Sequence, residues 1–376
     1  MMKFLRKKAR PLRPGILLGV VVAMLSGCSR IEHSVAPQYV YVAAEHTFLR
    51  NRVAPVANFV TEVTNGERLR VLQQQTRFYQ VKAPNGKVGW IEQLYVVDQA
   101  EMDKFDALRK EYAHTPAVAK AVLEETSYLH DGPSVDDPHY YLLKSKDKLD
   151  MLMRASVARR ESTLAMIQRQ QDIKEGKTPP PVPMEDYWLV RDGKGRTGWV
   201  RGSALVPDVP DSVLILAPSE RMIGTYLFRQ VMDPTADTPD HMMGEYVAVF
   251  APYQAGLPYD FDEVRVFTWD VFHHQYETAY SIHHIEGFFP VKVGHEKFGQ
   301  ETDPVFSFEI SKDPNIALNP DTGRVAPGPL VTVKYRMEGV IARQIEGPMV
   351  LSPQTVTRKP VRTRDSRARG KLRHQH

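Results

Sequence analysis

Two stretches of the sequence decide the fold, because they repeat one another: FYQVKAPNGKVGWI at residues 78–91 and YWLVRDGKGRTGWV at residues 187–200. Each begins with alternating apolar and polar side chains, the pattern of a half-buried strand. A turn follows in which Gly and Asn or Asp supply positions that tolerate positive φ. A Gly-Trp pair then opens the next run in both stretches. Each stretch therefore predicts a β-hairpin.

The repeat continues toward the N-terminus. Residues 47–72 align without gaps with residues 127–152 at an offset of 80, and their apolar positions coincide. The offset is 109 between the two hairpins, so the second copy contains 29 additional residues. Short strands over roughly 60 residues favour a small barrel, which leaves few sheet edges exposed. We expect two such barrels, at residues 39–98 and 118–208.

The two copies resemble the bacterial SH3 domain. The resemblance is carried by Leu49-Arg50-Asn51 and by Leu129-His130-Asp131-Gly132-Pro133-Ser134, where the family often has L-N-V-R-x-G-P-S, and by the turn and Gly-Trp pair. The first copy has Val53 and Ala54 where the second keeps Pro-Ser, so its latter half carries most of the resemblance. The resemblance implies binding, often of cell-wall peptides or of protein partners, without catalysis by the module.

Candidate ligand contacts are aromatic and polar residues of the two copies. The paired Trp90 and Trp199 follow a turn and are expected to pack in the cores. Trp188 stands beside Tyr187, and two interpretations stay open for it, a peptide groove and a core position. The complete set of candidate contacts is Tyr79, Tyr128, His130, Asp131, Tyr187 and Trp188.

Residues 1–27 have the composition of an export signal. Six Lys and Arg and no acidic residue accompany the apolar run at residues 16–25. A ten-residue helix covers about half of a bilayer core, which favours a cleaved signal over the alternative, an uncleaved anchor. The segment ends in Leu25-Ser26-Gly27-Cys28, which resembles the lipobox of bacterial lipoproteins.

The lipobox resemblance implies cleavage between Gly27 and Cys28, diacylglycerol on the Cys28 thiol and a further acyl chain, such as palmitate, on the new amine. Several acyl chains anchor a protein firmly to a membrane. Ser29, in place of Asp, favours the periplasmic face of the outer membrane in lipoproteins sorted by that position. We therefore expect a cell-envelope protein, with exposure at the cell surface as the alternative.

The single cysteine restricts the chemistry of the chain. With Cys28 lipidated, no disulfide, no Cys-His protease and no thiolate zinc site can form. Residues 212–353 also contain no Gly-x-Ser-x-Gly and no Ser-x-x-Lys motif that would organise a nucleophilic serine. We expect a binding or scaffold protein that is not an enzyme and needs no cofactor.

Charge is divided unevenly along the 376 residues. Residues 28–355 contain 35 Lys and Arg against 44 Asp and Glu, which argues against nucleic-acid binding by the body. The tail, residues 354–376, contains eight Lys and Arg and one Asp. It is expected to be disordered, either solvated or in contact with anionic polymers or lipid head groups.

The remaining segments complete the expected organisation. Residues 28–38 are a linker, and residues 99–117 are a helical connector whose apolar residues recur at three- and four-residue steps. The additional residues of the second copy, 155–183, are expected to form a helix over 155–174 and a proline-rich return. Residues 212–353 alternate as strands, which favours a β-sandwich or an open barrel. The predicted fold class is therefore mainly β.

Two histidine pairs suggest an alternative function. His273-His274 and His283-His284 lie at either end of one strand-like run, and they would coordinate zinc with His295 or Glu296 if that run were a hairpin arm. Exposed loop histidines explain the same pattern, and no His-Glu-x-x-His motif is present. The alternative is a metal-dependent envelope hydrolase that uses this segment.

Overall fold

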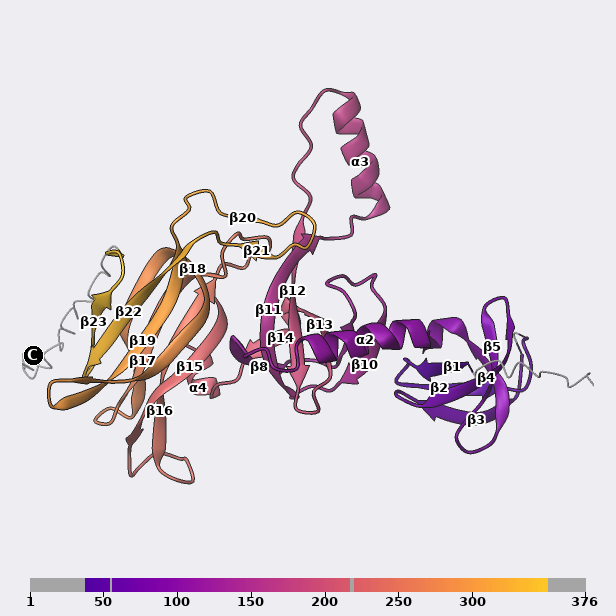
Figure 1. The fold of residues 1–376 in the computed structure, drawn as a ribbon, viewed down its shortest axis with the longest axis horizontal. Coiled ribbons are helices and arrows are strands. Elements are labelled where there is room, and N and C mark those ends of the chain that lie inside the picture. The colour runs from indigo at the N-terminus through magenta and orange to yellow at the C-terminus, as the bar shows by residue number, and fades with distance from the viewer. Residues whose placement is uncertain (1–37, 55, 217–219, 351–376) are drawn as a thin grey trace, which may run out of the picture. The chain divides into compact units, whose positions relative to one another are not determined.

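The computed structural model describes residues 38–54, 56–216 and 220–350. The signal segment, the lipobox, Cys28 and the basic tail lie outside the described residues. The predicted mainly β fold class is confirmed, with three large antiparallel sheets and few helices (Figure 1). Within the described part, no helix combines the length and the apolar character needed to cross a bilayer.

The first sheet forms the first module, residues 39–98. Its seven strands follow the order β3-β2-β6-β5-β4-β1-β7. One side chain from nearly every strand is buried in its core, among them Leu49, Val63, Leu69, Val81 and Ile91. Its elements are β1 (Tyr39–Val42), β2 (His46–Arg50), β3 (Phe59–Thr64), β4 (Arg68–Gln75), β5 (Phe78–Lys82), β6 (Val88–Glu92), the short 3-10 helix η1 (Gln93–Tyr95) and β7 (Val96–Asp98).

The second sheet forms the second module, residues 119–207. Its order is β10-β9-β13-β12-β11-β8-β14, which is the order of the first sheet with each strand number raised by seven. The repeat in the sequence therefore corresponds to one strand arrangement used twice. Its elements are β8 (Ala119–Leu123), β9 (Ser127–His130), β10 (His139–Leu143), β11 (Lys148–Ala158), β12 (Met184–Asp192), β13 (Thr197–Arg201), η2 (Gly202–Ala204) and β14 (Leu205–Pro207).

The glycine of each Gly-Trp pair is required for the same structural reason, the close approach of a second strand. A Cβ on Gly89 would lie 2.8 Å from the Cβ of Leu49, and a Cβ on Gly198 would lie 2.8 Å from the Cβ of Leu129. Strand β2 thus crosses β6 closely, and β9 crosses β13 in the same way. Only glycine fits at these two crossings, since any side chain would overlap backbone or core atoms.

A helix joins the two modules. Helix α2 (Gln99–Glu111) begins at Asp98, whose carboxylate accepts a hydrogen bond from the backbone N–H of Glu101 at 2.9 Å. Met102 and Phe105 are buried in the core of the second module, and Tyr112 is buried directly after the helix. The apolar stripe expected over residues 99–117 is therefore the packing face of the helix.

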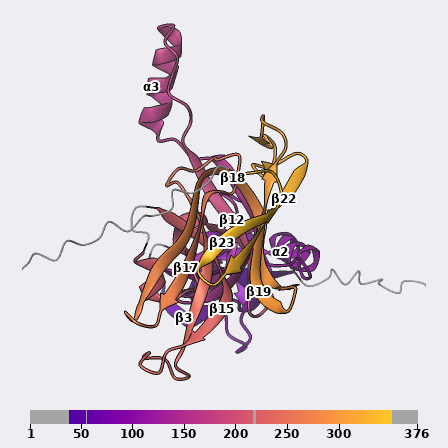
Figure 2. The ribbon, with the colours of Figure 1, turned by 90° about the vertical axis from the view of Figure 1, so that its left-hand side faces the viewer.

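The additional residues of the second copy extend one hairpin. Residues 155–158, expected to be helical, instead continue β11 and pair with β12, because Ala155 and Ser156 are buried against that strand. Helix α3 (Thr163–Lys174) then projects from the end of the β11–β12 ribbon (Figure 1 and Figure 2). None of its residues is buried.

The third sheet is a single seven-stranded meander, β15-β16-β17-β18-β19-β22-β23. Strand β18 pairs with β17 through its first half and with β19 through its second half. Strand β15 also contacts β18 and β19, so the sheet curls around one apolar core. The elements are α4 (Asp211–Leu214), β15 (Arg221–Met232), β16 (Met242–Ala251), β17 (Phe261–Asp270), β18 (Gln275–Phe298), β19 (Glu301–Ser311), β20 (Ala317–Leu318), β21 (Val325–Ala326), β22 (Leu330–Glu338) and β23 (Ile341–Glu346).

A buried guanidinium ties the second module to the third sheet. Arg154, on β11, donates from Nη2 to the carbonyl oxygens of Leu257 at 2.8 Å and Tyr259 at 2.6 Å. The same side chain forms ion pairs with Asp186 and Asp260, both at 3.4 Å. Burial raises the pKa of Asp260, and Arg154 opposes that rise. The network therefore keeps charged groups satisfied in a site from which water is excluded.

Removing this guanidinium should destabilise the protein strongly. In Arg154→Met, Asp260 loses its cationic partner and Asp186 keeps only Arg221, and we expect a loss of about 3–5 kcal/mol in the free energy of unfolding. Urea unfolding of the soluble chain, residues 28–376 with Cys28→Ser, measures it. Arg160→Met removes an exposed ion pair to Asp136 and should cost less than about 1 kcal/mol. If both variants lost the same free energy of unfolding, the result would contradict a stabilising role of the buried network.

Candidate ligand-binding site

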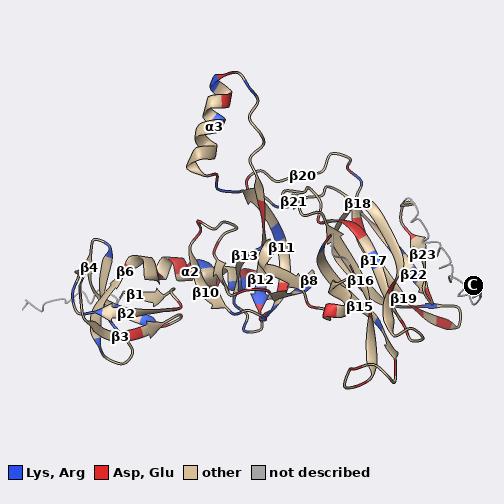
Figure 3. Ribbon diagram, turned by 180° about the vertical axis from the view of Figure 1, so that it is seen from behind, with Lys and Arg blue, Asp and Glu red and all other residues tan. Residues whose placement is uncertain are grey.

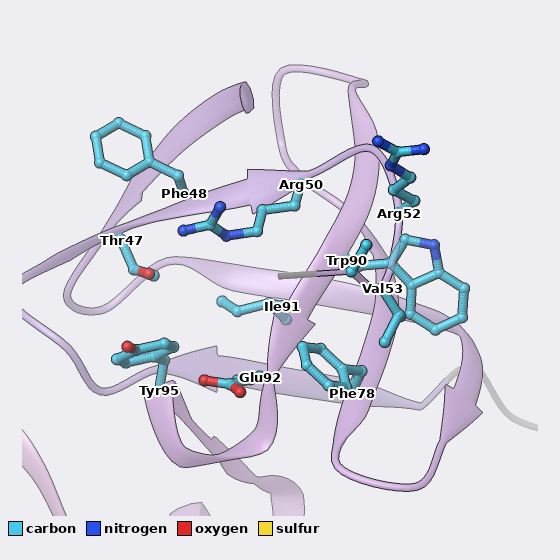
Figure 4. Close-up of a pocket in the computed structure, with 11 residues that line it drawn as sticks. Thr47, Phe48, Arg50, Arg52, Val53, Phe78, Trp90, Ile91, Glu92 and Tyr95 are labelled. Atoms are coloured by element: carbon cyan, nitrogen blue, oxygen red, sulfur yellow. The ribbon is translucent and has the colours of Figure 1, made fainter. Parts of the chain in front are cut away.

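A pocket of about 450 Å³ lies on the first module. Aromatic rings supply most of its apolar wall, and three charged side chains stand at its rim (Figure 4). Its lining residues are Thr47, Phe48, Arg50, Arg52, Val53, Ala54, Phe78, Trp90, Ile91, Glu92 and Tyr95.

The alternation of three neighbouring strands builds this pocket. On β6, Gly89 and Ile91 face the core, and Trp90 and Glu92 face outward. On β2, Leu49 faces the core and Arg50 lies opposite Trp90 in the strand register. Phe78 of β5 lies opposite Glu92. Outward residues of β2, β6 and β5 therefore meet on one face of the sheet.

Much of the aromatic surface at this site is accessible. Phe48 and Tyr95 are 36% and 37% exposed, and Phe59, whose ring centroid is 4.6 Å from that of Phe48, is 66% exposed. Trp90 is partly exposed, although its place after the turn glycine predicted a core position. Aromatic rings offer a large contact area with few rotatable bonds, which suits them to hold a ligand.

The charges at the rim have no partners of opposite charge among the described residues. The guanidinium of Arg50 lies 5.5 Å from the ring centroid of Phe59, and Arg52 donates to the carbonyl oxygen of Val56 at 3.2 Å. No described carboxylate forms an ion pair with either arginine, and no described cation pairs with Glu92. These groups are thus available to a ligand.

The corresponding face of the second module is covered by the chain itself. Tyr187 and Trp199, the counterparts of Phe78 and Trp90, are 1% and 4% exposed and pack with Tyr112 at the end of α2 in one apolar cluster. Arg191 donates to the carbonyl oxygens of Tyr112, Ala113 and Thr115 and so fixes the segment after α2 against β12. The aromatic pair that lines an open pocket in the first module is core in the second.

Two predicted ligand contacts, Tyr187 and Trp188, are buried in the second module. Trp188 is 4% exposed and packs edge-to-face against Phe289, with 5.8 Å between ring centroids. Tyr187 is covered as described above. Of the two interpretations of Trp188, the structure shows the core position, and neither side chain is presented to a ligand.

The other four predicted contacts gather around a second, shallower pocket of about 320 Å³. Tyr79 lines it together with His139. The rings of Tyr128 and His130 lie 4.6 and 5.5 Å from that of His139. Asp131 forms an ion pair with Lys104 of α2 at 3.2 Å. Burial, followed by the neighbouring His130, lowers the pKa of His139. Sequence reasoning thus found this pocket's surroundings and missed most of the larger pocket.

The two histidine pairs do not come together. His273 and His274 lie in the turn between β17 and β18, and His283 and His284 lie on β18, roughly 30 Å further along a continuous strand at about 3.3 Å per residue. His295 and Glu296 are further along the same strand. The run between the pairs is an arm of the β17–β18 hairpin, as the expectation required, but its extended backbone holds the pairs apart, so the zinc site expected from both pairs is not formed.

Each of three histidines instead has its own carboxylate. His273 pairs with Asp270 and His274 with Asp233, both at 2.7 Å, and His283 pairs with Glu263 at 3.1 Å. Ligand atoms of Asp270, His273 and Glu277 lie within 4.8 Å of one another, close enough to hold a metal ion. Asp270 also accepts hydrogen bonds from the backbone of the turn, which accounts for its position without a metal.

The comparisons with known proteins bear on the first module. Residues 47–97 match the family of the bacterial SH3 domain. A bacterial SH3 domain therefore occupies the segment that holds the larger pocket, and we call the first module the SH3 domain from here on. No curated protein is similar to the chain in sequence.

Similar solved structures include "Structure of NlpC2 from Trichomonas vaginalis". The identity is 8%, the similarity covers 54% of this chain and 61% of that one, and the TM-score is 0.15. At this TM-score the similarity carries no structural or functional argument.

The environment of Glu263, the ion-pair partner of His283, predicts that the stability of the protein depends on pH. Burial raises the pKa of Glu263 to about 7, with a further rise from Glu220 and opposition from Arg265. The folded chain therefore binds a proton more tightly than the unfolded chain, and stability is lost as the pH rises from about 4.5 to about 7. Glu263→Gln should flatten this part of the curve of unfolding free energy against pH. The exposed Glu301→Gln should leave it unchanged, and equal curves for wild type and Glu263→Gln would contradict the assignment.

Proposed function

We propose that the protein is a non-catalytic lipoprotein of the cell envelope that holds a peptide ligand in the pocket of its SH3 domain. The observation that carries this proposal is the open aromatic pocket between Phe48 and Tyr95, whose counterpart in the second module is filled by the chain's own α2. Bacterial SH3 domains commonly bind peptidoglycan or proteins, which supports a cell-wall peptide as the ligand and a protein of the envelope as the second candidate.

We further propose that the second module is a second SH3-like unit with a structural role. The shared strand order and the two equivalent glycine crossings support a common origin of the modules. Its former binding face packs on α2, and its β11–β12 ribbon holds the third sheet through Arg154. In this proposal the SH3 domain binds the ligand, and the second module supports the third sheet.

A sedimentation experiment tests wall binding. The soluble chain should sediment with isolated peptidoglycan at low and moderate salt, and Trp90→Ala should reduce the bound fraction about tenfold or more, because stacking on an aromatic anchor is lost. Phe272→Ala, which removes an 88% exposed ring on the β17–β18 turn, should leave binding unchanged. Absence of sedimentation would contradict wall binding, and crosslinking in cells would then show whether the pocket holds a protein.

Membrane attachment through Cys28 is part of the same proposal. The full-length protein should fractionate with membranes, and Cys28→Ser should release it, because the acyl chains that bury methylene groups in the bilayer are absent. Mass spectrometry of the native protein should show a lipidated N-terminal cysteine and no leader. An unmodified thiol on an uncleaved chain would contradict the lipoprotein assignment.

The basic tail adds a second envelope contact in this proposal. Its cations would bind anionic polymers or lipid head groups next to the anchor. The metal-dependent hydrolase stays as the alternative through the cluster of Asp270, His273 and Glu277. Stoichiometric zinc in the purified soluble chain would favour that alternative.

A further inference from the structure

We propose that the ligand of the SH3 domain carries a carboxylate, held by Arg50, beside an apolar side chain that lies against Trp90 and Phe78. This inference rests on the proposed function and specifies the chemistry of the ligand. It follows from three observations: the placement of the charges around the pocket, their lack of partners, and the charge of the SH3 domain relative to the rest of the chain.

The charges occupy opposite edges of the pocket. Figure 4 shows Arg50 and Arg52 in the upper part of the view, with their guanidinium groups apart, and Glu92 beside Tyr95 in the lower part, while Trp90 and Phe78 lie at the right and Phe48 at the left. A ligand group that reaches Arg50 therefore lies near the aromatic rings of Phe48 and Trp90, which line the same pocket. A peptide with one acidic and one apolar group matches this arrangement, and Glu92 disfavours a ligand with several negative charges by repulsion.

A half-buried arginine without an ion pair is unusual among the described residues. Elsewhere in the described residues, half-buried arginines are paired with carboxylates, as in Arg191 with Asp150 at 3.0 Å and Arg336 with Asp303 at 2.5 Å. Arg50 is half-buried and faces the larger pocket without such a partner, whereas Arg52 is exposed, as are Arg70 and Arg77, which also have no ion pair. Guanidinium groups bind carboxylates through two parallel hydrogen bonds, so a carboxylate is the ligand group that completes the site.

The SH3 domain is also more basic than the rest of the body. Residues 39–98 contain seven Lys and Arg against five Asp and Glu, whereas residues 99–355 contain 27 against 38. Figure 3 shows charged residues of both signs along the ribbon of the SH3 domain. An anionic ligand is thus attracted to this module and repelled by the others, within the distance over which salt screens charges.

Matched peptides test the inference. The probes are N-acetyl-Leu-Glu-amide, its neutral isostere N-acetyl-Leu-Gln-amide, and N-acetyl-Leu-Gln with a free terminal carboxylate. The measurement is the NMR signal of the Trp90 indole N–H in the soluble chain, assigned as the signal missing from Trp90→Phe. The two carboxylate peptides should shift this signal with an affinity about fivefold to tenfold higher than the neutral peptide. A preference for one of them shows whether the carboxylate comes from a side chain or from a chain end.

Variants link the preference to Arg50. Arg50→Gln should abolish the difference between the Glu and Gln peptides. The matched control is Arg70→Gln, at an exposed position of β4 outside the pocket, which should preserve the difference. Raising the salt concentration should weaken binding of the Glu peptide more than that of the Gln peptide.

Two outcomes would overturn the inference. Equal affinities for the Glu and Gln peptides would remove the carboxylate and leave the proposed pocket function standing. Absence of any shift with all three peptides would also overturn it, and the sedimentation of wild type against Trp90→Ala then decides separately whether the pocket binds a ligand at all.

Discussion

The close crossing of β2 over β6 is the constraint on which the rest of the site depends. The backbone of one strand approaches the other so tightly that only Gly89 fits, and the residue after it must then face away from the core. Trp90 is consequently held on the outer surface, opposite Arg50 in the register. The same crossing at Gly198 holds Trp199 outward in the second module. Whether this outward tryptophan binds a ligand or becomes core depends on what covers it.

What covers Trp199 is the end of α2, and the consequence extends to the third sheet. Tyr112 and Arg191 cover the outer face of β12, so the β11–β12 ribbon is packed on that side without a ligand. The ribbon continues to Arg154, whose buried contacts with Leu257, Tyr259 and Asp260 fix the third sheet. Such a network is stable only if every charged member is satisfied, which requires the ribbon to be rigid. Burial of the outer face of β12 and the attachment of the third sheet to the same ribbon are thus physically linked.

The sequence predicted the parts of the structure that depend on local pattern. Alternation, the turn residues and the Gly-Trp pairs indicated the hairpins, and the repeat indicated that two units share one arrangement. Prediction from the sequence failed where packing between distant segments determines whether a side chain is buried or exposed. Trp90 and Trp199 have the same local sequence context, yet one is at the surface and the other is buried by α2. The histidine pairs were expected to meet if the run between them were a hairpin arm. The run is such an arm, and the bulged but continuous β18 holds the two pairs apart along its length.

Most of the pocket was missed for the same reason. Phe48, Arg50 and Glu92 are unremarkable as single residues, and they become a site only because β2 and β6 adjoin although 40 residues separate them in the chain. A usable signal did exist: the outward positions flanking Trp90 in the register carry aromatic and charged residues, whereas the core positions carry only aliphatic ones. In the second module the corresponding charge has a partner: Arg201 stands where the first module has Glu92, and it forms an ion pair with Glu185. A charge that is neutralised within the fold is lost to recognition, so the unpaired charges of the SH3 domain are the reason why we propose a ligand site there.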